Sequence, residues 1–219
     1  MNRLQLLWAS SAGKKAVMAV TGLVWVAYLV THMLANLLVF QGPGKINAYS
    51  AFLHGTGGAL WAARMVLIAA LVLHIVAAIQ LAARKQEARP VGYAGGYEPQ
   101  VSTIAARTIR WGGALILLFL TYHILHFTVG TAHPAFLEGN PYHNVASGFR
   151  HIFVVVLYLV AMALVGLHLY HGIWSSGRSL GMSPPSPHPL RRSLALMLAV
   201  LIWLGFSLIP LAVYLGVVR

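Results

Sequence analysis

The chain has 219 residues, of which 59% are hydrophobic and 8% are charged, and its formal net charge at pH 7 is +12. So apolar a composition excludes an ordinary soluble domain and predicts an integral membrane protein. The basic residues lie at the ends of apolar segments, which indicates topology determinants and argues against nucleic-acid binding. Cysteine is absent, so this chain contributes no disulfide, thiol nucleophile or iron–sulfur ligand.

Five apolar runs are long enough to cross a bilayer, since a spanning helix needs roughly 20 mostly apolar residues. In chain order, we predict transmembrane helices at residues 16–40, 60–83, 111–130, 152–174 and 193–218. The first run is too long for a signal-peptide core, and we expect it to be retained. The sequence therefore predicts one all-α integral membrane domain over residues 1–219.

Lysine and arginine are unevenly divided between the two sides of this arrangement. The side opposite the N-terminus carries only Lys45, Arg64, Arg150 and Arg219, and all the others lie on the N-terminal side. The positive-inside rule then places the N-terminus in the cytoplasm and the C-terminus outside. Two polar inner loops are expected, one at 84–110 with Arg89-Pro90 and Gly95-Gly96, the other at 175–192 with four prolines.

Four of the five runs carry a histidine deep in the apolar stretch. His74 and His168 each precede an inner-side arginine by ten residues, which corresponds to roughly 15 Å of helix. His32 and His123 lie roughly 20 to 25 Å from the inner boundary by the same rise per residue. Depth therefore pairs His74 with His168 at an inner level and His32 with His123 at an outer level. Each pair joins two helices, as a haem with two axial histidines requires.

Two further histidines, His126 and His171, lie three residues after a predicted ligand. A weak internal repeat distinguishes them from the predicted ligands. In this repeat, Gly22 precedes His32 by ten residues and Gly113 precedes His123 by ten. In the register of this repeat, alanines stand opposite His126 and His171. We therefore predict that these two do not bind iron and are available to bond haem propionates, water or quinone.

Simpler interpretations remain open for several of these residues. A single membrane histidine is often only a hydrogen-bonded packing residue, although four at two matched depths make this less favourable. The glycines Gly22, Gly112, Gly113, Gly166 and Gly172 fit close helix contacts as well as room for a porphyrin. Arg64 lies inside an apolar run, where it either binds a propionate of the outer haem or extends to the interface.

Several short motifs resemble a known family, the single-chain, five-helix, di-haem cytochrome b anchor of succinate dehydrogenase and fumarate reductase. In order, they are KAVMAVTG at 15–22, HMLANL at 32–37, INAY at 46–49, LWAAR at 60–64, ARP at 88–90, HILHFT at 123–128 and HLYHGIWS at 168–175. The similarity extends over nearly the whole chain.

The resemblance implies two b haems, with His74 and His168 holding the one nearer the soluble subunits and His32 and His123 the distal one. It also implies a bacterial cytoplasmic membrane and two partners on its inner face. These are a flavoprotein with covalent FAD and the dicarboxylate site, and an iron–sulfur protein. Electrons would pass between the iron–sulfur protein and menaquinone or another quinone, so this subunit of respiratory complex II contains no catalytic residue of its own.

One departure from the family pattern concerns protons. Some fumarate reductases of this type use an acidic residue in the first outer loop, but residues 41–59 contain none. The remaining outer-side candidates for proton transfer are His54, His126, His133, Glu138 and His143, of which His126 is closest in sequence to a predicted ligand. A plain solvated loop is the simpler interpretation of the others.

Two other classes of protein fit parts of the pattern. The first is the haem-bearing membrane subunit of a nitrate reductase, formate dehydrogenase or hydrogenase. In the nitrate-reductase type a single helix pair holds both haems, whereas here the deep histidines lie on four helices. A metal or proton transporter is the other, but transport sites favour acids beside histidines and the apolar runs contain no Asp or Glu. A b-type spectrum would separate a cytochrome from a transporter.

Overall fold

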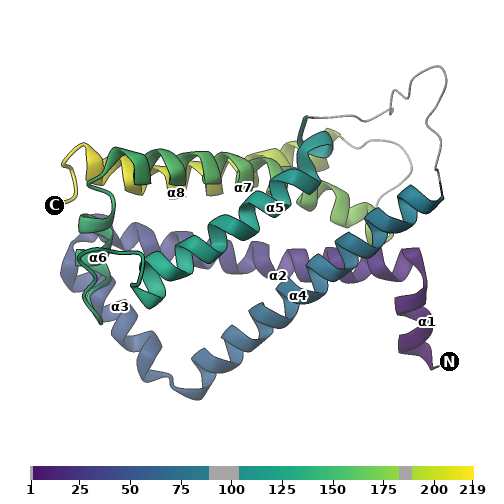
Figure 1. The fold of residues 1–219 in the computed structure, drawn as a ribbon, viewed down its shortest axis with the longest axis horizontal. Coiled ribbons are helices and arrows are strands. Elements are labelled where there is room, and N and C mark those ends of the chain that lie inside the picture. Colours follow the sequence, from purple (N-terminus) through teal and green to yellow (C-terminus); the bar gives the residue numbers. More distant parts are fainter. Residues whose placement is uncertain (1, 89–103, 183–188) are drawn as a thin grey trace.

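The computed structural model describes residues 2–88, 104–182 and 189–219, and the regular structure in these ranges is entirely helical (Figure 1). Parts of both predicted inner loops, including Arg89-Pro90, Gly95-Gly96 and three of the four prolines, lie outside the described residues. In chain order the elements are α1 (Arg3–Ala9), α2 (Ser11–Leu37), the 3-10 turn η1 (Leu38–Gln41), α3 (Pro43–Gly55), α4 (Gly58–Glu87), α5 (Ile104–Ile124), the π-helical turn η2 (Leu125–Val129), α6 (Pro141–Gly148), α7 (Ile152–Ser179) and α8 (Pro189–Tyr214).

Five helical segments have the length and hydropathy to cross a membrane, which confirms the predicted multi-pass character. They are Ser11–Gln41, Gly58–Glu87, Ile104–Val129, Ile152–Ser179 and Pro189–Tyr214. Most extend beyond the predicted ranges by several residues, because the helices continue into the basic flanks. In Figure 1 the two termini lie at opposite ends of the bundle, as an odd number of crossings requires.

Three details of the prediction need correction. The last helix ends at Tyr214, four residues before the predicted end at Val218, because Gly216 adopts a left-handed φ of 76° and terminates it. The first outer loop contains a helix, α3, which begins at Pro43, a residue favoured in the first turn. The long helix α5 continues into a π-helical turn, which ends at Gly130 with φ 85°.

Helices α2 and α7 are at the centre of the bundle, and each of the other long helices packs against one or both of them. Helix α7 packs against α8, α5 and α2, whereas α4 packs chiefly against α2. Figure 1 shows α4 close to α2 at the end near α1 and diverging from it toward α3. Small residues, among them Ala161 of α7 and Ala199 of α8, are buried where these two helices meet. Close backbone approach through small side chains is typical of helix packing in membranes.

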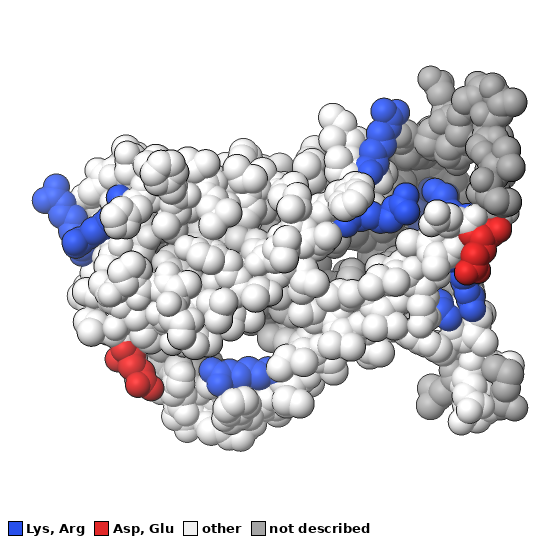
Figure 2. Space-filling model, viewed as in Figure 1, with Lys and Arg blue, Asp and Glu red and all other residues white. Residues whose placement is uncertain are grey.

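Charged side chains are concentrated at the ends of the molecule. On the face of the molecule shown in Figure 2, the broad middle carries no lysine, arginine or acid, apart from the corner where α3 and α4 meet. Large apolar side chains cover the outside of the helices, for example Leu118 at 68% and Phe153 at 87% exposure. An uncharged belt with exposed apolar side chains is what a bilayer core requires of the surface that it contacts.

Packing between α7 and α8 is testable at Ile202, whose side chain is fully buried among α7 residues such as Met162 and Val165. We expect Ile202→Ala to lower the free energy of unfolding by about 2 kcal/mol or more, because the cavity removes contacts that lipid cannot replace. The neighbouring Leu201 is 53% exposed, and Leu201→Ala should change stability by less than about 0.5 kcal/mol. Thermal unfolding in detergent measures both; equal losses would contradict this packing.

Candidate functional site

The structure brings the four deep histidines together as two pairs. His32 of α2 lies opposite His123 of α5, with ring centroids 6.0 Å apart and an interplanar angle of 87°. His74 of α4 lies opposite His168 of α7, with centroids 6.2 Å apart and an angle of 53°. These are the pairs that depth predicted, and each joins one helix of the first half of the chain to one of the second half.

The separation within each pair equals the space for one metal ion. An imidazole nitrogen lies about 2 Å from a metal that it coordinates, so two imidazoles on opposite sides of one ion have ring centroids roughly 6 Å apart. Within the described residues, no group of three or more His, Cys, Asp or Glu side chains is arranged to hold a metal. A metal between two of these histidines would therefore need its other ligands from a non-protein group, as a porphyrin provides.

The Nδ1 nitrogens of the imidazoles have different partners. His74 Nδ1 lies 3.0 Å from the Met18 carbonyl oxygen and 3.3 Å from Thr21 Oγ1, which suits an N–H donating to the backbone. His123 Nδ1 lies 3.3 Å from the Tyr158 hydroxyl. Such bonds fix which nitrogen is free for a metal, because the other one carries the proton. His168 Nδ1 is buried without a partner within the described part of the chain.

Two glycines leave room beside the inner pair. A Cβ added to Gly22 of α2 would lie 3.3 Å from His74 Cε1, and one added to Gly113 of α5 would lie 3.6 Å from His168 Cε1. These two glycines therefore face imidazoles across the helix interface. Gly166, in contrast, faces the Trp203 side chain at 3.4 Å and is a helix contact. Gly112 and Gly172 have nothing within 4 Å of an added Cβ.

A spacing of ten residues organises both levels. On α2 and α5, the outer histidine follows the inner-level glycine by ten residues. On α4 and α7, the inner histidine follows Arg64 and Tyr158 by ten residues, and the Tyr158 hydroxyl lies beside His123 of the outer pair. Ten residues of α-helix rise about 15 Å, so on each helix the two residues of this spacing lie at different depths. Each of the four helices therefore contributes one residue to each level.

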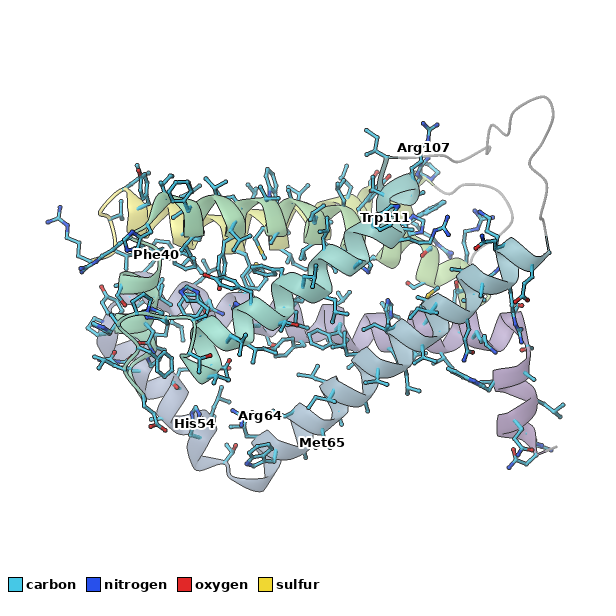
Figure 3. The ribbon with its side chains drawn as sticks, viewed as in Figure 1. Phe40, His54, Arg64, Met65, Arg107 and Trp111 are labelled. Carbon is cyan, nitrogen blue, oxygen red and sulfur yellow. The ribbon has the colours of Figure 1, made fainter. Side chains whose placement is uncertain are left out.

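Arg64 lies near the outer end of α4, at the corner where α3 and α4 meet (Figure 3). Its guanidinium carbon is 4.9 Å from the centre of the Trp61 ring. Figure 2 shows a hollow on the same face between α4 and the rest of the bundle.

The two additional histidines do not join either pair. His126 is 1% exposed in η2, and its Nδ1 lies 3.0 Å from the Tyr158 hydroxyl. Its ring stacks on His133 at 4.9 Å and 25°, which is too close for a metal between the two rings. His171 packs edge-on against Trp174, with ring centroids 6.3 Å apart, and its Nδ1 is buried without a partner in the described ranges.

The other outer-side proton candidates are divided between buried and exposed positions. His133 is buried, and its Nε2 lies 2.9 Å from the Asn144 carbonyl oxygen. His54 and Glu138 are exposed and His143 is half-buried, and both of these histidines bond nearby backbone carbonyls. The sequence alone did not single out Tyr158. The signal that could have found it is the internal repeat, in which Tyr158 precedes His168 by ten residues as Arg64 precedes His74.

Comparisons with known proteins give no relative: no family model, no curated protein and no solved structure matches the chain. The arrangement of the site must therefore be interpreted from its own chemistry.

The pairing is testable with introduced cysteines, because the chain has none of its own. We expect His32→Cys combined with His123→Cys, and His74→Cys combined with His168→Cys, to be joined efficiently by a short bifunctional thiol reagent. The exchanged combinations, His32→Cys with His168→Cys and His74→Cys with His123→Cys, serve as controls and should react poorly because they join different levels. Peptide mapping by mass spectrometry measures the yield; equal yields in all four would contradict the two-level arrangement.

Proposed function

We propose that the chain is the di-haem cytochrome b anchor of a succinate:quinone oxidoreductase. The observation that carries the proposal is the pair of two-histidine sites at two depths, with ring centroids 6.0 Å and 6.2 Å apart, which would leave room for one metal ion in each pair. His74 and His168 would hold the inner haem, and His32 and His123 the outer one. A b-type haem with two histidine ligands supplies one-electron redox chemistry and leaves no coordination position for oxygen.

The residues around the pairs fit such a group in several respects. Gly22 and Gly113 keep the space beside the inner imidazoles free of side chains. The Met18 carbonyl holds the His74 ring through Nδ1, which leaves Nε2 for iron. Arg64 lies toward the outer end of α4, where its guanidinium would pair with a propionate of the outer haem.

The two levels give the chain the role of an electron conduit across part of the membrane. Electrons would enter or leave at the inner side through an iron–sulfur subunit, which in turn serves a flavoprotein with FAD. Menaquinone or another quinone would be the membrane-soluble partner. With the N-terminus in the cytoplasm and the C-terminus outside, in a bacterial cytoplasmic membrane, the more basic end faces the soluble subunits, and its charge favours docking of an acidic surface.

Single histidine replacements test the ligand assignment. His74→Ala or His168→Ala should remove one haem and leave the outer one, because each haem depends on both axial ligands. His126→Ala and His171→Ala are matched controls on the same helices as His123 and His168, and both should retain two haems. Pyridine haemochrome assays with reduced-minus-oxidised spectra measure the content. Loss of a haem in His171→Ala together with retention of both in His168→Ala would contradict the assignment.

A further inference from the structure

Tyr158 connects two histidines of the outer level. It lies on α7, is 5% exposed, and its ring packs edge-on against Phe119 at 4.9 Å and Phe149 at 4.8 Å. Its hydroxyl oxygen lies 3.3 Å from His123 Nδ1 and 3.0 Å from His126 Nδ1. The aromatic contacts fix the position of the ring, so the hydroxyl is held between the two imidazoles.

The number of protons that the hydroxyl and the two imidazoles carry gives these two hydrogen bonds a direction. If His123 binds iron through Nε2, its Nδ1 carries a proton and donates it to the Tyr158 oxygen. The hydroxyl has a single proton, and it then donates to His126 Nδ1. His126 must therefore carry its own proton on Nε2. One hydroxyl thus gives a hydrogen-bond partner to Nδ1 of both imidazoles. Without it, these two nitrogens would lack partners in an apolar surrounding, which is unfavourable.

We propose that Tyr158 is the positioning residue of the outer haem ligand, and that it helps to set the potential of the outer haem. This inference rests on the proposed function. An acceptor for the second N–H of a ligating histidine fixes the ring orientation and raises the basicity of the ligand. A more basic ligand stabilises oxidised iron. The hydroxyl of Tyr158 therefore lowers the potential of the outer haem.

The two levels are held by different acceptors. At the inner level, His74 bonds a backbone carbonyl, which no side-chain substitution can remove. At the outer level, the acceptor is a side chain ten residues from His168 on the same helix. Second-shell hydrogen bonding is one of the ways in which a protein tunes a haem. The chain can thus adjust the outer haem at Tyr158 without altering the inner one.

The test uses Tyr158→Phe in the whole purified complex, with optical redox titration of both haems. The substitution removes one oxygen and keeps the ring contacts with Phe119 and Phe149. We expect both haems to be retained, the outer potential to become more positive and the inner potential to stay unchanged.

Tyr28→Phe is the matched control. The Tyr28 ring stacks on His32, the other outer ligand, and its hydroxyl makes no hydrogen bond within the described residues. Its removal should leave both potentials unchanged. Loss of only the outer haem in Tyr158→Phe, with both haems kept in Tyr28→Phe, would also support the role of Tyr158.

Two results would overturn the inference. An unchanged outer potential in Tyr158→Phe would show that the hydroxyl does not act on the ligand, and an equal shift of both haems, or the same shift in Tyr28→Phe, would show a general structural effect. Failure of the haem assignment on which the inference rests is distinguishable from these outcomes, because the wild-type complex would then contain no haem to titrate.

Discussion

Polar nitrogens in hydrocarbon are the constraint on which this structure depends. An imidazole placed in the apolar core of a membrane costs several kcal/mol unless its nitrogens have partners. The helices that carry His32, His74, His123 and His168 must therefore bring each ring to an acceptor, a metal or a second polar group. The bundle sets the rings opposite one another in two pairs at two levels, and the contacts of α2 and α7 with their neighbours keep the levels in place.

The repeated spacing of ten residues explains how four helices supply two sites of different character. Helices α2 and α5 give a histidine to the outer level and a glycine to the inner one. Helices α4 and α7 give a histidine to the inner level and a large polar residue, Arg64 or Tyr158, to the outer one. The inner site is thus bordered by small residues and backbone, whereas the hydroxyl of Tyr158 borders the outer site. Two haems in these surroundings would differ in potential, which suits directed transfer of electrons.

Much of this arrangement follows from the sequence, because a spanning helix has a fixed rise and a minimum apolar length. Counting residues from the basic flanks was enough to predict five spans and to pair His74 with His168 and His32 with His123. The same register set His126 and His171 apart from the pairs. The proposed haem type and partner subunits come from the resemblance to cytochrome b anchors, because residue spacing alone does not specify them.

What could not be predicted depends on contacts between residues far apart in the chain. The role of Tyr158 follows from its bonds to His123 and His126, which lie more than 30 residues earlier. The π-helical turn that carries His126 changes its direction relative to a regular α-helix, and apolar periodicity does not indicate such a turn. The short helices α3 and α6 are too polar or too brief for a hydropathy argument, although Pro43 and Pro141 mark their first turns.

If each histidine pair holds one b haem, the purified wild-type complex must contain a fixed ratio of haem to this chain. A pyridine haemochrome assay combined with quantitative protein determination gives this ratio. We expect two haem b per chain. A ratio of zero would contradict the cytochrome, and a ratio of one would contradict the assignment of both pairs as haem ligands.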